Sequence, residues 1–174
     1  MVECGKRNIL LRYKIAKSVD MSELIGEYVC KVDNKGRLMI PTDLKLQLPG
    51  VETEGLVVLR GFEKQLTIYP KTEWKSKVEK LSKLSEYDTK SRAFLRYLTR
   101  GAIPLKLDGT SRVLFPKQLL EYAGITNEIT LTCLLTRIEA WDTATYNKMM
   151  DEMPEDFSGM AQDLMDKIEG GAHE

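Results

Sequence analysis

Two stretches of the sequence share one pattern, VDNKGRLMIP at residues 32–41 and LDGTSRVLFP at residues 107–116. Each places an aspartate after an apolar residue, an arginine four positions later, and then three apolar residues and a proline. The two copies are offset by 75 positions, and a later match between residues 66 and 138 has an offset of 72. One length difference of three residues therefore separates the two blocks, and the chain contains an internal duplication of about 70 residues.

Short strands and turns surround both stretches. In DNKG, aspartate at the first position and glycine at the fourth favour a type I turn, which predicts a β-hairpin with strands over residues 28–32 and 37–40. The proline at the end of each stretch suits the start of a short helix. Further strands are predicted over residues 56–59, 66–69, 103–107, 112–115, 129–135 and 138–141. We therefore expect an α+β, β-rich fold in which two copies of one motif form a pseudo-two-fold pair.

Helices are predicted between the two copies and after the second. They cover residues 72–84, 88–99, 143–150 and 155–168. Apolar residues at helical spacing in the first two helices are expected on their buried side: Trp74, Val78, Leu81, Leu84, Phe94, Leu95 and Leu98. Residues 71–100 also carry nine Lys or Arg residues against four acids. We expect these charges on the solvated side of the helices, with DNA phosphates, a neighbouring subunit or an acidic tail as alternative partners.

The duplication divides the chain into five segments. These are an N-terminal extension at residues 1–20, the first repeat at 25–72, a helical connector at 73–101, the second repeat at 102–145, and an acidic helical tail at 146–174. The extension carries five basic and two acidic residues. It is either dispensable, with Met21 as the natural start, or a basic arm that helps to hold an anionic partner.

Charge and residue inventory restrict the classes of function. The chain has 26 basic and 26 acidic residues, a balance that by itself argues against a nucleic-acid partner. Eight of the acids lie in residues 151–174, so the acidic tail masks a mildly basic body. His173 is the only histidine, which disfavours Ser-His and Cys-His catalysis. No zinc spacing or glycine-rich phosphate loop occurs, so we expect no enzyme, metal, other cofactor or small-molecule substrate.

Cysteine usage and hydropathy indicate the compartment. Cys4, Cys30 and Cys133 are odd in number and scattered along the chain, unlike a disulfide framework. No apolar run approaches the ~18 residues of a membrane span. Near the N-terminus, Arg12 and Lys14 interrupt the apolar stretch that a signal peptide would need. We expect a cytoplasmic protein with no membrane association.

The two repeated arginines are the candidate binding residues. Arg37 and Arg112 each begin a return strand beside an exposed turn, and arginine is the usual bidentate reader of guanine in the major groove. Two-stranded ribbons fit that groove. One loop is too small to hold DNA, but two per chain, multiplied by oligomerisation, act through avidity. Asp33 and Asp108 favour the turns and can form surface ion pairs with the arginines, while Lys35 adds charge to the first loop.

The order of these motifs resembles the bacterial MraZ family from about residue 21 to residue 150. The resemblance rests on GEYVCKVDNKGRLMIP, LTIYPKTEW, RAFLRYLTRGA and LDGTSRVLFPKQLLEYAGI. It implies an AbrB-like, swapped-hairpin fold with two motifs per chain forming a pseudo-dimer, and a ring-shaped homo-oligomer.

The resemblance also implies a function. It implies a nucleoid-associated transcriptional regulator, usually a repressor of its own operon, that binds short direct repeats in double-stranded DNA upstream of the division and cell-wall gene cluster. The family's DNA-contacting residues map onto Asp33, Lys35, Arg37, Asp108 and Arg112.

The second copy departs from the first in its turn. Ser111 replaces Gly36, Thr110 replaces Lys35, and Gly109 occupies another turn position. We therefore expect a different turn type in the second loop and a weaker contact with DNA. Two other functions stay open: a ring-forming scaffold for protein partners, and an antitoxin-type DNA binder of the same fold whose tail wraps a toxin.

Overall fold

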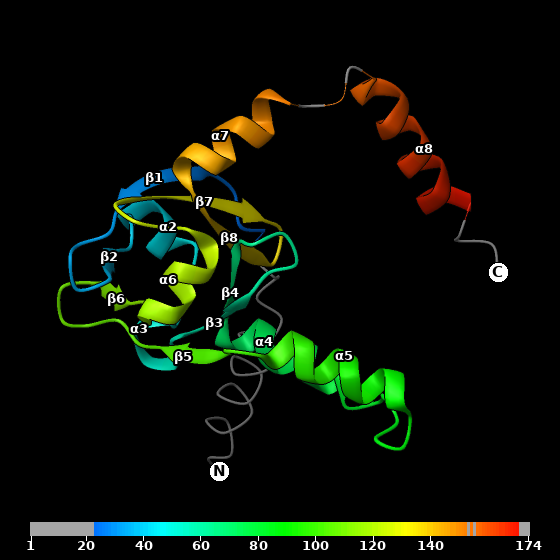
Figure 1. Cartoon of the computed structure of the whole chain (residues 1–174), viewed down its shortest axis with the longest axis horizontal. Coiled ribbons are helices and arrows are strands. Elements are labelled where there is room, and N and C mark those ends of the chain that lie inside the picture. Colours follow the sequence, from blue (N-terminus) through cyan, green and yellow to red (C-terminus); the bar gives the residue numbers. More distant parts are fainter. Residues whose placement is uncertain (1–22, 153, 155, 171–174) are drawn as a thin grey trace, which may run out of the picture.

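The computed structural model describes residues 23–152, 154 and 156–170 (Figure 1). The expectations for residues 1–20, and those involving His173 and Cys4, lie outside this part of the chain. In chain order the elements are β1 (Glu27–Lys31), β2 (Arg37–Met39), α2 (Thr42–Leu46), α3 (Val51–Glu54), β3 (Leu56–Arg60), β4 (Leu66–Pro70), α4 (Lys71–Leu81), α5 (Thr89–Thr99), β5 (Ile103–Leu105), β6 (Arg112–Leu114), α6 (Lys117–Ala123), β7 (Glu128–Leu134), β8 (Arg137–Asp142), α7 (Thr143–Asp151) and α8 (Phe157–Gly170). The fold is mixed α and β, as predicted.

The strands form one six-stranded sheet and one two-stranded ribbon. The order in the larger sheet is β1-β7-β8-β4-β3-β5, and every neighbouring pair is antiparallel. The β2–β6 ribbon is also antiparallel. Because β1 to β4 belong to the first copy of the repeat and β5 to β8 to the second, most of these neighbours come from different copies.

The two copies interleave symmetrically. β1 of the first copy pairs with β7 of the second, and β5 of the second pairs with β3 of the first. In the ribbon, Leu38 lies opposite Val113, which is its own equivalent at an offset of 75. In the centre of the sheet, Thr67 lies opposite Glu139, its equivalent at an offset of 72. The strand order therefore reads the same from either edge when the copies are exchanged.

This interleaving corrects the predicted hairpin. β1 and β2 flank the turn as expected, but only an isolated bridge between Val32 and Leu38 joins them. Each strand instead makes its ladder with a strand of the other copy. Turn residues specify the reversal of the chain, whereas the choice of strand partner depends on side chains far away in the sequence.

Alternating side chains of the large sheet pack into two apolar layers. On one face, the main core joins Val58 to Leu38 of β2, Leu44 of α2 and Leu119 of α6. On the other face, a smaller cluster joins Val57, Leu59 and Tyr69 to Leu98 of α5. The first four residues of β3 are therefore all apolar and buried, because both faces of the strand are covered.

The helical connector differs from its predicted packing. Leu98 is buried, but Val78 and Phe94 are each 43% exposed and Leu84 is 38% exposed. Trp74 near the start of α4 and Leu81 at its end pack against the smaller cluster. Figure 1 shows α5 extending outward from the body. The predicted apolar stripe thus continues beyond the area that the sheet can cover.

Candidate nucleic-acid interface

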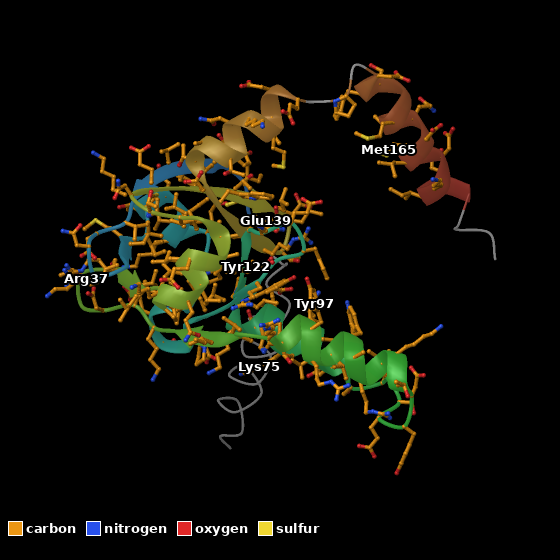
Figure 2. All side chains as sticks on the ribbon, in the orientation of Figure 1. Arg37, Lys75, Tyr97, Tyr122, Glu139 and Met165 are labelled. Carbon is orange, nitrogen blue, oxygen red and sulfur yellow. The ribbon has the colours of Figure 1, made fainter. Side chains whose placement is uncertain are left out.

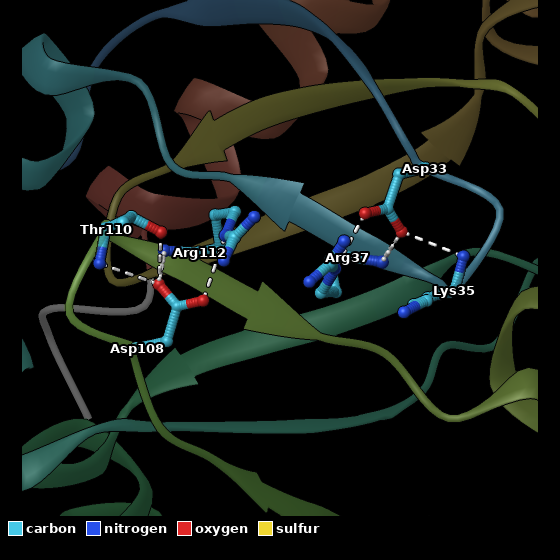
Figure 3. Close-up of polar contacts among 6 residues, drawn as sticks. All are labelled: Asp33, Lys35, Arg37, Asp108, Thr110 and Arg112. Carbon is cyan, nitrogen blue, oxygen red and sulfur yellow. Dashed lines mark hydrogen bonds and ion pairs between the residues drawn. The ribbon is translucent and has the colours of Figure 1, made fainter.

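The first repeated turn is closed by its aspartate. The Asp33 N–H donates to the Arg37 carbonyl and the Gly36 N–H donates to the Asp33 carbonyl, both at 2.9 Å. The carboxylate atom Oδ1 accepts from the main-chain N–H groups of Lys35 and Arg37, each at 2.9 Å. Its partner Oδ2 accepts from Arg37 Nε at 2.7 Å (Figure 3). One carboxylate therefore fixes both the loop and the side chain that follows it.

The second turn repeats this geometry. Asp108 Oδ1 accepts from the main-chain N–H groups of Thr110 and Arg112 at 2.9 and 3.0 Å, and Asp108 Oδ2 accepts from Arg112 Nε at 2.9 Å (Figure 3). Thr110 adds a hydroxyl bond of 2.8 Å to Oδ1. We call each aspartate–arginine pair, Asp33–Arg37 and Asp108–Arg112, a clamp.

The expectation of a different turn type in the second loop is wrong. Gly36 has φ +82°, and Ser111 takes the same left-handed region with φ +59°. Serine in this region is strained relative to glycine. The Asp108 bonds and a 2.7 Å bond from Lys45 Nζ to the Ser111 hydroxyl stabilise the local structure. Gly109 is not among the positive-φ glycines.

Each clamp leaves the outer end of its guanidinium available. In the described part of the chain, the Nη atoms of Arg37 and Arg112 make no hydrogen bond or ion pair. The two side chains are 34% and 33% exposed, and Figure 2 shows Arg37 at the outer edge of the body. An arginine held at Nε presents its two Nη groups as a fixed fork, the geometry that matches guanine or phosphate oxygens.

The clamp carboxylates stay ionised at neutral pH. The pKa of Asp33 is held below its ordinary value chiefly by the main-chain N–H of Arg37, with the Arg37 side chain adding to the effect. The pKa of Asp108 is lowered further, first by the main-chain N–H of Arg112 and then by the hydroxyl of Thr110. Hydrogen bonds to a charged carboxylate favour that charged form, so the turn chemistry itself keeps both clamps closed.

The β2–β6 ribbon brings the two clamps together. Arg37 lies opposite Leu114, and Met39 lies opposite Arg112, so all four side chains share the outer face. The arginines are two residues apart along the ribbon, a separation of about 7 Å. The intervening Leu38 and Val113 point into the core and are 0% and 1% exposed.

Sequence reasoning missed the two apolar members of this face. Met39 is 61% exposed and Leu114 is 57% exposed, although both lie in strands. They are equivalent at the offset of 75, and that offset was the available signal. Apolar side chains beside arginines in a ribbon can contact the methyl group of thymine.

Lysines flank both ends of the ribbon. Lys35 is exposed in the first loop, and Lys31 and Lys106 are exposed equivalents two residues before each aspartate. At the second loop, Lys45 reaches the Ser111 hydroxyl, but its ammonium is also paired with Glu52. The first loop therefore carries the larger uncompensated positive charge.

Other kinds of site find little support in the described residues. Within residues 23–152, 154 and 156–170, no group of three or more His, Cys, Asp or Glu residues could hold a metal ion. None of the helices described is long and apolar enough to cross a membrane. Cys30 and Cys133 are half-buried against the main core, and burial raises the pKa of both thiols, which makes them poor nucleophiles at neutral pH.

Comparison with known proteins identifies the family. A family model described as "MraZ protein, putative antitoxin-like" matches residues 24–97 and again residues 98–168. This chain belongs to the MraZ family. The double match also shows that it contains two MraZ domains in tandem, in agreement with the duplication found in the sequence.

Curated MraZ relatives match along most of their length. A protein named "Transcriptional regulator MraZ" from Flavobacterium psychrophilum is 38% identical over 149 residues, covering 85% of this chain and 95% of the relative. Proteins of the same name from Christiangramia forsetii and Cytophaga hutchinsonii are 37% and 35% identical, over 83% and 79% of this chain and 94% and 91% of their own lengths. All three names describe regulators of transcription rather than enzymes.

Proposed function

We propose that this MraZ chain is a sequence-specific DNA-binding transcriptional regulator that reads double-stranded DNA with the outer face of its β2–β6 ribbon. The observation that carries the proposal is the pair of equivalent clamps on adjacent antiparallel strands, each with two Nη groups that no described residue binds. The names of the curated relatives support it. Arg37 and Arg112 contact bases or phosphates, Lys35 contributes charge, and Asp33 and Asp108 orient the arginines.

The proposal extends to the fold, the assembly and the target. We assign an AbrB-like, swapped-hairpin fold in which the repeats at residues 25–72 and 102–145 form a pseudo-dimer, a division that the interleaved strand pairing supports. A ring-shaped homo-oligomer supplies further copies of the ribbon for avidity. Each contacts a short direct repeat, about one helical turn (~34 Å) from the next on the same DNA face. The target is the promoter of its own operon in the division and cell-wall gene cluster, where the protein acts as a cytoplasmic, nucleoid-associated repressor.

Fluorescence anisotropy with a labelled duplex from upstream of the gene tests this proposal. The variants are Arg37→Ala, Arg112→Ala and the double substitution, and the matched control is Lys148→Ala on α7, whose side chain is 78% exposed. Each lost arginine contact is expected to weaken binding by about 1–3 kcal/mol, or by roughly 5- to 150-fold. Because no described residue pairs with the Lys35 side chain, whereas Lys45 is paired, we expect Arg37→Ala to cause the larger loss. Binding by the double variant equal to that of the control would overturn the proposal.

Salt dependence separates DNA binding from a scaffold that binds only proteins. A protein that neutralises several phosphates loses affinity steeply between about 50 and 200 mM salt, because binding releases counterions. We expect that decline for the native chain and a shallower slope for the arginine variants. Flat or absent binding over the whole series would favour the scaffold. An antitoxin-type role would leave this DNA response intact and would add a bound toxin.

A further inference from the structure

The α8 helix carries an apolar stripe that none of the described residues of the body covers. Phe157, Leu164 and Ile168 recur at heptad spacing and are 51%, 51% and 69% exposed, with Met160 and Met165 beside them at 43% and 59%. Within the described residues, no hydrogen bond, ion pair or core cluster joins α8 to the body, and Figure 2 shows Met165 on a helix that stands apart from it. A helix of 14 residues with no tertiary contact is only marginally stable in water.

Comparison of the two repeats explains why α8 does not pack on the sheet face of the second repeat. In the first copy, the outer sheet face presents Val57 and Leu59, on which Leu98 of α5 packs. The pairing registers place Thr130 and Thr132 at the equivalent positions in the second copy. Thr130 bonds to the Thr143 hydroxyl at 3.1 Å. Apart from Val29, which lies opposite Thr130 and is 62% exposed, this face offers α8 little apolar surface to bury.

The helical connector carries an exposed apolar surface surrounded by basic residues. Val78, Leu84, Tyr87, Phe94 and Tyr97 are between 38% and 86% exposed, within a segment of nine basic and four acidic residues at 71–100. We call this surface the connector face. α8 and the residues before it are strongly acidic, since residues 151–170 contain seven acids and one lysine. The stripe of α8 and the connector face are therefore complementary: both are apolar, and the charges around them have opposite signs.

Topology places the starts of the connector and of the C-terminal helices at opposite ends of the sheet. α4 starts immediately after β4, and α7 starts immediately after β8. Since β4 and β8 are antiparallel neighbours, the two helical segments leave opposite ends of the sheet, as Figure 1 shows. A contact between α8 of one copy and the connector face of the next therefore joins unlike surfaces head to tail, and such contacts close into rings when the rotation permits.

We propose that α8 docks its apolar stripe on the connector face of a second copy of this chain and so links neighbouring subunits of the homo-oligomer. This proposal rests on the homo-oligomer of the proposed function, and it needs no DNA. Light scattering after size exclusion, at low salt and without DNA, measures the mass directly. The failure of docking is therefore distinct from the failure of DNA binding.

Reciprocal charge reversal tests the contact and its partner. One variant carries Asp163→Lys, Asp166→Lys and Glu169→Lys on α8, and the other carries Lys80→Glu, Lys83→Glu and Lys90→Glu on the connector, all at exposed positions. We expect each variant alone to lose the oligomeric mass of the native chain and an equimolar mixture to regain it. Regain in the mixture requires docking between chains. An equimolar mixture that stays at the mass of the separate variants would show that α8 and the connector face do not meet between chains, and would overturn the proposal.

A second pair of variants tests the apolar stripe. Leu164→Glu with Ile168→Glu places charge in the stripe, and Gln162→Glu places the same kind of charge on the polar side of the same helix. We expect the first to reduce the mass to that of a monomer and the second to leave it unchanged, with circular dichroism confirming that both are folded. A monomeric native chain, or an undiminished mass for Leu164→Glu with Ile168→Glu, would overturn the proposal.

Discussion

The main-chain N–H of Phe115 donates a 2.9 Å hydrogen bond to the carbonyl oxygen of Gly36, and so ties the first loop to the second copy of the repeat. The equivalent bond, from Ile40 to the carbonyl oxygen of Ser111, measures 3.0 Å. Each clamp therefore depends on a strand of the other copy for its position. The recognition loops are parts of one shared ribbon, and a change in one loop is transmitted across it.

Exchange of the residues at the left-handed positions tests this coupling. A Cβ added to Gly36 would lie 2.8 Å from the carbonyl oxygen of Phe115, at φ +82°. Gly36→Ser is expected to lower stability by about 1–2 kcal/mol and the Tm by about 2–8 °C. Ser111→Gly removes backbone strain but also the bond to Lys45, so we expect its Tm to change by less than about 2 °C. Differential scanning calorimetry measures the Tm of both variants. Equal decreases in Tm would contradict the predicted difference between the two loops.

Neighbouring residues on opposite faces of β2 separate stability from recognition. Leu38 is fully buried, so Leu38→Ala is expected to reduce the free energy of unfolding by about 2–5 kcal/mol. Met39 is 61% exposed, so Met39→Ala should change stability by less than about 0.5 kcal/mol. It should still weaken DNA binding about fivefold, for the loss of roughly 1 kcal/mol of apolar contact. Urea unfolding and anisotropy on the same samples distinguish the two effects, and unchanged DNA binding by Met39→Ala would remove Met39 from the interface.

The titration of Asp108 reports on the second clamp. Its folded pKa lies below the ordinary value of 3.8, so the ionised form stabilises the folded loop above pH 3.8. That contribution is lost as the pH falls through the folded pKa. Carbon-detected NMR of the carboxyl group is expected to show no titration of Asp108 between about pH 5 and 8. Thr110→Val should raise the pKa only in part, because the main-chain N–H of Arg112 is the largest cause of the shift. A midpoint above 3.8 in the native chain would contradict the clamp.

The elements were predictable from local chemistry, whereas their partners were not. Pro41, Pro70 and Pro116 each stand at the N-cap of a helix, and Gly124 has the left-handed conformation expected where a helix ends. Such signals act within a few residues. The pairing of β1 with β7 depends on contacts about 100 residues apart, and the DNKG turn is compatible with a hairpin or with an exchange of strands. Local sequence signals thus predicted where the chain turns but not which strand it meets, and only the family resemblance implied an exchange of strands.

The candidate site was predictable in its charged residues only. The offset of 75 placed Asp33, Arg37, Asp108 and Arg112 in equivalent turns. The structure brings the two arginines into one ribbon, each bound by its aspartate. The exposed Met39 and Leu114 were missed because apolar residues in a strand are usually buried. The equivalence of the two turns was missed because Ser111 occupies a left-handed conformation that glycine prefers. No sequence pattern near Ser111 indicates that conformation.

Substitution of the clamp aspartates distinguishes orientation from simple charge. Asp33→Asn with Asp108→Asn removes two negative charges from the ribbon, and on charge alone it should strengthen binding to every DNA sequence. If the carboxylates orient Arg37 and Arg112, the variant should instead lose affinity for the promoter by roughly 5- to 150-fold. Its affinity for a scrambled duplex should be unchanged or higher. Competition between the two duplexes at one salt concentration measures the ratio. Asp33→Asn and Asp108→Asn are also measured singly, with Asp151→Asn on α7 as the charge-matched control. An equal gain on both duplexes would show that the aspartates do not orient the arginines for recognition, whereas a loss confined to the promoter assigns specificity to the clamps.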